Sequence, residues 1–352
     1  MTASSAPHPA VDPSLLAPEY IRSLGRYVPG KPVGELAREF GLTATHIVKL
    51  ASNENPRGPS PAVRAAIAAA TDEVCRYPDG DAFELKAALS ARLRVSPFQL
   101  VLGNGSNDVL ELATQARGAT GIEVPARDYG HDLAAMRSAI TPQTRIVFIA
   151  NPNNPTGTWI ASEPLRAFIA SVPANVLVVL DEAYNEYLES GERAESAAWI
   201  AEHPNLIISR TFSKAYGLAA LRVGYGVMDA KVADMMNRVR QPFNVNALAQ
   251  AAAVAALADT GYVDESRALN TAGIQQLCEG VRALGLEYVA SHANFLLVRV
   301  GDGAAIYQRL LEQGVIVRPV AGYGLPEFLR VTVGLPAENR RFLDAMAAVL
   351  AR

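Results

Sequence analysis

The chain has 352 residues, of which 32 are lysine or arginine and 35 are aspartate or glutamate, so its formal net charge is −3. Half of the residues are hydrophobic, which excludes fibrous and disordered classes and predicts one large domain with a smaller one beside it. The small net charge gives no sign of a nucleic acid or an anionic membrane as partner. We therefore expect small-molecule partners.

Cysteine and hydropathy patterns favour a cytoplasmic protein. Cys75 and Cys278 are the only cysteines and lie far apart, as expected of thiols in a reducing compartment. The first residues, MTASSAPHPAVDPSLLAP, lack the basic and apolar regions of a signal peptide. The Ala-rich run LAQAAAVAALA at 248–258 is shorter than the roughly 20 residues of a membrane span. The five histidines show no metal-ligand spacing, so we expect no metal site.

Between about residues 60 and 230, short apolar runs alternate with helical patterns. This alternation predicts an α/β fold in three layers, a mostly parallel sheet flanked by helices. The predicted strands are QLVL (99–102), RIVFIA (145–150), VLVVLD (176–181), LIISR (206–210) and LRVGYGV (221–227). The segments GNGSND, NPNNPTG, DEAY and TFSK follow the first four strands, at the sheet edge where α/β proteins bind ligands.

A long helical region at 229–284 follows the sheet. Three further strands, NFLLVRV, VIVRPV and FLRVTV, then alternate with helices and predict a smaller α+β domain. We expect three divisions: an N-terminal arm with the start of the small domain (1–48), a large domain (49–280) and the small C-terminal domain (281–352).

Lys214 lies among residues that suit a phosphate. Thr211 and Ser213 flank it, and Arg222 follows eight positions later. Hydroxyl groups and a guanidinium are good ligands for phosphate. A phosphate beside a lysine suggests a phosphorylated aldehyde held as a Schiff base, although a lysine after a strand is more often only a solvated charge.

The neighbouring strand ends carry further candidates. Asp181 leaves an apolar strand, where a carboxylate is costly unless paired; it is either a structural partner or the group that keeps a pyridine nitrogen protonated. Tyr184 and Asn154 could bond a ring oxygen. The turn GNGSND places Ser106 and free backbone N–H groups at a helix start, which is an anion site of modest specificity.

Several segments together resemble the histidinol-phosphate aminotransferases. The matching segments are LASNENPRGPSP (50–61), YPDG (77–80), NPNNPTG, DEAY, TFSKAYGLAALRVGYG (211–226) and VIVRPVAGYGLPEFLRVTVG (315–334). The resemblance runs from about Tyr20 to the C-terminus, and any one motif alone would be weak. It implies the aspartate-aminotransferase fold (fold type I), the cofactor pyridoxal 5'-phosphate and a homodimer.

The resemblance also implies residue roles. Lys214 forms the Schiff base with the cofactor, and Lys214, Asp181 and Tyr184 are the catalytic residues. The implied cofactor-binding residues are Ser106, Asn107, Asn154, Asp181, Tyr184, Thr211, Ser213, Lys214 and Arg222. The implied substrate-binding residues are Tyr20, Asn53, Asn154, Arg318 and Arg330. Asn53 and Asn55 lie near the position where the arm of one subunit completes the site of the other.

The implied reaction is a ping-pong transfer of an amino group between L-histidinol phosphate and 2-oxoglutarate, which yields imidazole acetol phosphate and glutamate. Three alternatives stay open. The chain could be an aromatic amino-acid aminotransferase, a pyridoxal-phosphate decarboxylase of a phosphorylated amino acid, or a homologue without catalytic activity.

One segment is shorter than the family pattern. After the helix that begins at Asn107, the family usually adds a strand and an aromatic residue over the cofactor ring, whereas here TQARGA follows Leu112 and Ala113 directly. Roughly 20 to 25 residues are missing, about the size of a strand with its connections. Either the chain lacks them or the printed sequence joins two separated stretches. We expect the second, because loss of a sheet strand should be strongly destabilising.

Overall fold

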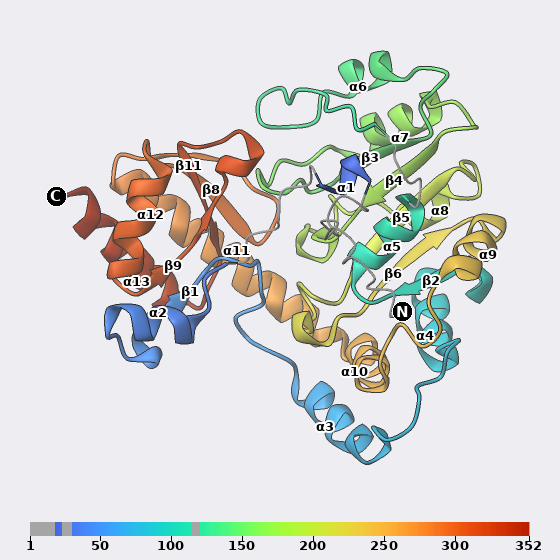
Figure 1. Ribbon diagram of the computed structural model, residues 1–352, viewed down its shortest axis with the longest axis horizontal. Coiled ribbons are helices and arrows are strands. Elements are labelled where there is room, and N and C mark those ends of the chain that lie inside the picture. Colours follow the sequence, from blue (N-terminus) through green and yellow to red (C-terminus); the bar gives the residue numbers. More distant parts are fainter. Residues whose placement is uncertain (1–17, 23–29, 115–119, 352) are drawn as a thin grey trace, which may run out of the picture.

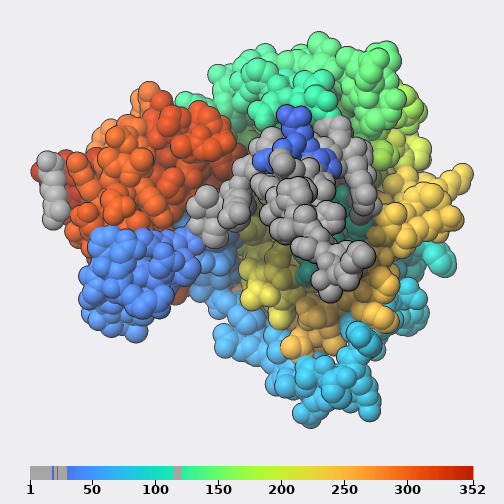
Figure 2. Space-filling view, in the orientation of Figure 1, coloured from blue at the N-terminus to red at the C-terminus, as the bar shows by residue number. Residues whose placement is uncertain are grey.

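Two lobes make up the molecule in the computed structural model, which describes residues 18–22, 30–114 and 120–351. Figure 1 shows the larger lobe with a central sheet and the smaller lobe with the C-terminus, and the long helix α11 (Thr260–Ala283) runs between them. In the space-filling view of Figure 2, helix α2 (Val33–Phe40) lies with the C-terminal segments in the smaller lobe. Helix α2 therefore contributes to the same lobe as the C-terminal end of the chain.

The larger lobe contains a five-stranded sheet with the order β2-β6-β5-β4-β3. Its strands are β2 (Leu100–Gly103), β3 (Ile146–Ala150), β4 (Leu177–Asp181), β5 (Leu206–Thr211) and β6 (Gly224–Met228). Strands β3, β4 and β5 pair in parallel, and β6 pairs antiparallel with both β5 and β2. Only β6 is reversed, so the predicted mostly parallel sheet is confirmed.

Helices cover both faces of this sheet. Two separate apolar clusters lie against it: one contains Leu180 and Ile208, and the other contains Val179 and Ile207. Because side chains alternate along a strand, these pairs point to opposite faces, which gives the predicted three layers. The large-lobe helices are α3 (Pro61–Ala70), α4 (Phe83–Leu93), α5 (Ser106–Thr114), α6 (Leu133–Ala139), α7 (Ser162–Ser171), α8 (Ser196–Trp199), α9 (Ala230–Val239) and α10 (Ala247–Ala258).

Local sequence explains where many helices begin. The N-cap side chain accepts a hydrogen bond from a backbone N–H of the first turn at Ser60, Asp132, Asp229, Asn246 and Asp302. Such caps satisfy donors that the helix cannot pair internally. The helical region predicted at 229–284 is divided into α9, α10 and α11, and side-chain caps mark the starts of α9 and α10 but not that of α11.

The smaller lobe has its own sheet and core. Strands β7 (Glu287–Val289), β8 (Phe295–Arg299), β10 (Arg318–Pro319) and β11 (Phe328–Thr332) form an antiparallel sheet in the order β10-β11-β8-β7. A separate parallel pair joins β1 (Val48–Lys49) to β9 (Val315–Ile316). Helices α12 (Gly303–Glu312) and α13 (Pro336–Leu350) pack here, and α1 (Glu19–Arg22) is the remaining described helix. None of the helices in the described ranges is long and apolar enough to cross a bilayer.

The apolar clusters support the predicted division of the chain, which we retain as a proposal. One cluster joins Leu50 and Leu277 to residues of the C-terminal strands, such as Leu296 and Leu329. The proposed boundaries at residues 48 and 280 therefore lie close to where β1 and α11 meet the smaller lobe.

The structure has no additional strand at the short segment. Leu112 and Ala113 are consecutive residues of α5, which ends at Thr114. No strand lies between α5 and β3 among the described residues, and β3 ends the sheet. Phe148 on β3 is 44% exposed.

Candidate functional site

Four strands deliver the candidate residues to one edge of the large-lobe sheet. Strands β2, β3, β4 and β5 run in the same direction and end at Gly103, Ala150, Asp181 and Thr211. The segments that follow them are those that the sequence singled out. Their convergence follows from strand direction alone.

The predicted phosphate ligands come together around Arg222. Its Nη1 donates to Oγ of Ser213 at 3.2 Å. Gly105 has a φ of +84°, and a Cβ added there would overlap the guanidinium of Arg222. A Cβ at Gly224 would overlap the backbone nitrogen of Ser106. Glycine is thus required at both positions for the turn after β2 to approach β6 and Arg222.

Two hydroxyl groups and a helix start complete this group. Thr211 and Ser213 are buried, and Oγ1 of Thr211 accepts from the backbone nitrogen of Ser213 at 3.0 Å. Ser106 begins α5 and is also buried, whereas Asn107 in the same turn is exposed. Hydroxyls, a guanidinium and the free N–H groups of a helix start are the donor set that a phosphate needs.

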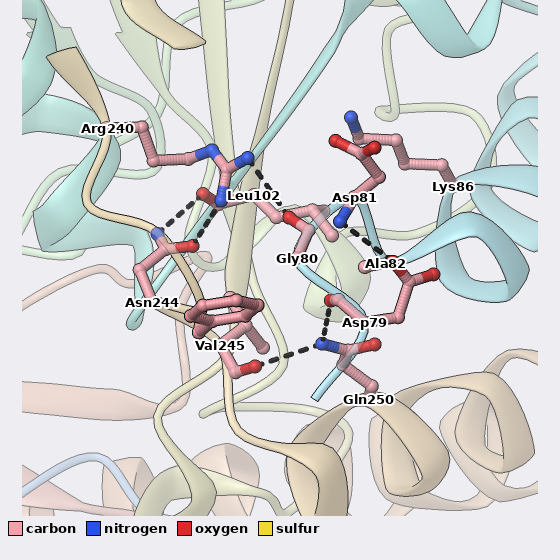
Figure 3. A pocket seen from close by; sticks show the side chains of 11 residues that line it. Asp79, Gly80, Asp81, Ala82, Lys86, Leu102, Arg240, Asn244, Val245 and Gln250 are labelled. Atoms are coloured by element: carbon pink, nitrogen blue, oxygen red, sulfur yellow. Dashed lines mark hydrogen bonds between the residues drawn. The ribbon is translucent and has the colours of Figure 1, made fainter. Parts of the chain in front are cut away.

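Arg240 and Asn244 line a hollow beside Gly80 and Leu102, as Figure 3 shows. Arg240 donates to the Gly80 carbonyl at 3.1 Å and to Oδ1 of Asn244 at 2.8 Å. Asn244 then donates to Oδ2 of Asp108 at 2.8 Å, and the same oxygen accepts from the backbone nitrogen of Asn104 at 2.8 Å. These side chains bond one another and the backbone of the Gly-rich turn, and they therefore hold the turn in place. The sequence analysis missed Arg240, Asn244 and Asp108.

Asp181 carries a half-buried carboxylate at the end of β4. Its Oδ1 accepts from the backbone nitrogen of Ala183 at 3.1 Å. Burial raises the pKa of the Asp181 carboxyl to about 6, and the positive charge of Lys214 opposes this rise. A protonated ring nitrogen would favour the ionised carboxylate in the same way, because an opposite charge stabilises it.

The Lys214 amine lies between the two lobes. Its Nζ donates to the Ser52 carbonyl at 3.0 Å and lies 5.9 Å from the centre of the Tyr184 ring. Burial, together with the positive charges of Arg330 and Arg222, lowers the pKa of Lys214 to about 8. Near neutral pH an appreciable fraction of this amine is therefore uncharged and able to act as a nucleophile or base.

Tyr184 and Asn53 bond each other directly. Nδ2 of Asn53 donates to the Tyr184 hydroxyl at 2.8 Å. Burial raises the pKa of Tyr184 to about 12, so its hydroxyl keeps the proton that it can donate. The Tyr184 ring packs edge-on against Phe295, with centroids 5.3 Å apart.

Arg330 reaches the site from the smaller lobe. It donates to Oδ1 of Asn154 and to the Ala51 carbonyl, the latter at 2.9 Å. Its guanidinium lies 5.2 Å from the Phe295 ring centre. Arg318 pairs with Arg330 in the register of β10 and β11, so the two arginines predicted for anionic substrate groups are neighbours across the strands.

Two predicted residues stand apart from this group. Tyr20 belongs to α1, but its side chain lies outside the described part of the structure. Asn55 is buried against its own chain, where Nδ2 donates to the Ala215 carbonyl at 2.8 Å and to Oγ of Ser266 at 2.9 Å. This places Asn55 behind Lys214 as a structural contact.

Comparisons with known proteins agree with this geometry. The family Aminotransferase class I and II matches residues 113–346. Histidinol-phosphate aminotransferase 2 of Ralstonia nicotianae is 54% identical over 363 positions, which cover 95% of this chain and 97% of that protein. The alignment is longer than this chain of 352 residues, so the relative has residues that this chain lacks.

Solved structures show the same fold. The histidinol-phosphate aminotransferase of Sinorhizobium meliloti, solved in complex with pyridoxal-5'-phosphate, has a TM-score of 0.86 and 29% identity and covers 95% of this chain and 97% of its own. A double mutant of Thermus thermophilus aspartate aminotransferase has a TM-score of 0.79 and 23% identity over 95% of this chain and 99% of its own. The predicted aspartate-aminotransferase fold is confirmed. The chain belongs to the class I and II aminotransferases and, within them, to the histidinol-phosphate aminotransferase family.

Proposed function

We propose that the chain transfers an amino group between L-histidinol phosphate and 2-oxoglutarate with pyridoxal 5'-phosphate as cofactor, in histidine biosynthesis. One observation carries the proposal: a half-buried lysine of lowered pKa, a half-buried aspartate and a phosphate-type donor set meet at one sheet edge. Two arginines from the other lobe lie beside them. This combination of groups matches the chemistry of the named relatives.

The residues present fit the cofactor. Ser106, Thr211, Ser213 and Arg222 would hold its phosphate with Asn107 at the same helix start, Asp181 would pair with the ring nitrogen, and Asn154 and Tyr184 would bond the ring oxygen. Lys214 would be its point of attachment. When bound, the cofactor supplies an electron-accepting ring that stabilises negative charge at the substrate carbon.

The chain itself supplies proton transfer and charge. Nζ of Lys214, with a pKa of about 8, accepts a proton from the substrate carbon and returns it to a neighbouring atom. The Asp181 carboxylate would keep the proton on the ring nitrogen of the bound cofactor. The Tyr184 hydroxyl, which stays protonated, donates to the ring oxygen.

The two arginines of the smaller lobe would select the substrates. Arg330 can form a two-pronged bond with a carboxylate, and Arg318 beside it adds a charge for a phosphate ester. With Tyr20 and Asn53, they would accept histidinol phosphate in one half of the reaction and 2-oxoglutarate or glutamate in the other. The aromatic alternative would use the same arginine for the carboxylate and would place a benzene ring where the phosphate lies.

We further propose a homodimer, on the basis of an apolar surface of the larger lobe. Tyr77, Phe83 and Phe98 are 83%, 75% and 80% exposed, and Tyr77 stacks on Phe243 with centroids 4.9 Å apart. Large exposed aromatic side chains are typical of surfaces that a partner covers.

The test is a direct assay with a lysine variant. The purified chain, supplied with pyridoxal 5'-phosphate, histidinol phosphate and 2-oxoglutarate, should form glutamate faster than it does with phenylalanine in place of histidinol phosphate. Lys214→Ala should abolish both glutamate formation and the absorbance of lysine-bound cofactor. The exposed Lys231→Ala on α9 should change neither.

Each alternative has its own outcome. Faster turnover with phenylalanine would assign the aromatic activity, and carbon dioxide release without 2-oxoglutarate would assign the decarboxylase. A wild-type chain that takes up no cofactor would support the non-catalytic homologue, which the shortened segment after α5 favours.

A further inference from the structure

The turn at residues 103–106 joins β2 to α5 and is closed by its own backbone. The Gly105 nitrogen donates to the Gly103 carbonyl at 2.8 Å, and Gly105 has a φ of +84°. The N–H groups of Ser106 and Asn107 follow directly, and N–H groups in the first turn of a helix have no acceptor within that helix. The shape of the turn therefore decides where these donors point.

Asp108 holds this turn from the start of α5. Its half-buried side chain accepts through Oδ2 from the Asn104 nitrogen at 2.8 Å, so it bonds the peptide that joins Gly103 to Asn104. A carboxylate at the start of a helix is also attracted by the free N–H groups of the first turn. Here the Asp108 carboxylate bonds back to the turn, which leaves those N–H groups for an anion.

Asn244 keeps the Asp108 carboxylate in this direction. Its Nδ2 donates to Oδ2 of Asp108 at 2.8 Å and to the Leu102 carbonyl at 3.0 Å, so it joins the end of β2 to the start of α5. Its Oδ1 accepts from Arg240 at 2.8 Å (Figure 3). Because a guanidinium only donates, this bond fixes which end of the Asn244 amide faces the carboxylate.

We propose that Asp108 and Asn244 are positioning residues: by holding the start of α5, they make the site prefer an aldehyde that carries a phosphate. The proposal rests on the proposed function, in which the start of α5 binds the phosphate of the cofactor. Without the Asp108 carboxylate, the peptide that joins Gly103 to Asn104 loses its anchor. Without Asn244, the carboxylate is free to bond the N–H groups of its own helix in competition with the phosphate.

Loss of charge and loss of the anchor have opposite effects. A carboxylate repels a nearby phosphate, so removal of the Asp108 charge alone should strengthen phosphate binding. Removal of the anchor should weaken phosphate binding by at least about 10-fold, the size expected of one hydrogen bond to a charged group. Asp108→Asn separates the two effects, because the amide keeps an acceptor oxygen and lacks the charge.

The experiment compares pyridoxal 5'-phosphate with pyridoxal, which lacks the phosphate. The purified chain is prepared without cofactor, and the dissociation constant of each aldehyde is measured by absorbance titration. Reduction with borohydride and mass spectrometry of the modified peptide check that Lys214 is the residue that binds both. The ratio of the two constants measures the preference for the phosphate and cancels any loss that both aldehydes share, such as a general loss of stability.

Asp229→Ala is the matched control. Asp229 is also half-buried and accepts from a backbone nitrogen at a helix start, that of Lys231 at 2.9 Å. It follows β6, which runs antiparallel to β5 and ends at the opposite edge of the sheet. Its loss therefore removes a similar bond far from the phosphate site.

Asp108→Ala should lower the preference for pyridoxal 5'-phosphate by at least about 10-fold, and Asn244→Ala should change it in the same direction. Asp108→Asn should keep or exceed the wild-type preference, and Asp229→Ala should keep it. An unchanged or larger preference in either Asp108→Ala or Asn244→Ala would overturn the inference; if Asp108→Ala does not fold, Asn244→Ala decides alone. A wild-type chain that binds neither aldehyde at Lys214 would instead count against the proposed function.

Discussion

A buried cluster of charges lies on the face of the sheet opposite Asp181. Glu182 follows Asp181 directly, and consecutive strand residues point to opposite faces. Oε2 of Glu182 accepts from Nε of Arg210 at 2.8 Å and from Oγ of Ser196 at 2.9 Å. Glu186 is buried nearby, and burial raises the pKa of its carboxyl to about 7 despite the positive charges of Arg210 and Arg92.

This raised pKa makes the stability of the chain depend on pH. Glutamate ordinarily ionises near pH 4.5, so between pH 4.5 and 7 the unfolded chain has lost a proton that folded Glu186 keeps. Stability falls as pH rises through this window and is constant above it. Glu186→Gln lacks this titrating group and so lacks this dependence. The free energy of unfolding of the variant minus that of the wild type should therefore increase by roughly 2 to 3 kcal/mol from pH 5 to pH 8.

Chemical denaturation at pH 5 and pH 8 measures this difference. Glu84→Gln, on the exposed side of α4, is the matched control and should give the same difference from wild type at both pH values. A constant difference for Glu186→Gln would show that Glu186 is already ionised in the folded chain at pH 5.

Local patterns predict the site residues but not the contacts between lobes. Lys214, Asp181 and Arg222 could be located from the sequence because each lies at or within three residues of the end of a recognisable strand. The bond from Asn294 to Asn53 joins residues 241 positions apart, and that from Arg330 to Asn154 spans 176. No periodicity in the sequence encodes such pairs, since they depend on how the two lobes pack.

At the scale of elements, each predicted strand overlaps a strand of the structure, but β1, β7 and the division of one predicted strand were not predicted. VIVRPV reads as one strand, yet it divides into β9, which pairs with β1, and β10, which pairs with β11. Pro319 has no backbone N–H, so it cannot donate a hydrogen bond to a neighbouring strand as a residue inside a sheet would. The partner of β9 comes from residues 48–49, which no local signal around residue 315 identifies.

Strand β3 forms an open edge of the large-lobe sheet. Nε2 of His131 lies 3.1 Å from the Ala150 carbonyl oxygen at the end of this strand, and Phe148 in its middle is 44% exposed. An exposed edge with an apolar side chain lowers stability and invites association. The three inner strands β4, β5 and β6 are nevertheless each paired on both sides. This pairing holds the shorter sheet together.

Restoring the missing segment should strengthen both the fold and cofactor binding. A chimera would insert between Leu112 and Ala113 the corresponding roughly 20 to 25 residues of the Ralstonia nicotianae relative. It should raise the thermal unfolding midpoint by several degrees and tighten pyridoxal 5'-phosphate binding, measured by absorbance titration. A Gly/Ser insert of equal length is the control. Equal behaviour of the two chimeras would show that the short connection costs the chain nothing.

At the scale of the molecule, the site lies where the two lobes meet. The large lobe supplies Lys214, Asp181 and Tyr184, and the smaller lobe supplies Arg330 and Asn294. The turn at residues 50–55 bonds both groups. Any change in the angle between the lobes therefore moves the substrate arginine relative to the lysine, which couples substrate binding to the position of the amine.

The proposed dimer surface lies on the larger lobe, away from the C-terminal strands. Phe83 begins α4, Phe98 precedes β2, and both are at least 75% exposed. Because burial of a large aromatic side chain contributes about 2 kcal/mol, the double variant Phe83→Glu/Phe98→Glu should weaken self-association by at least about 100-fold. Sedimentation velocity should then show the 37.5 kDa monomer where the wild type sediments as a dimer.

Leu350→Glu on α13 is the control. This apolar residue of the other lobe is 38% exposed, and its substitution should leave the dimer intact. Dissociation by both variants would indicate general destabilisation, and dissociation by neither would place the interface elsewhere.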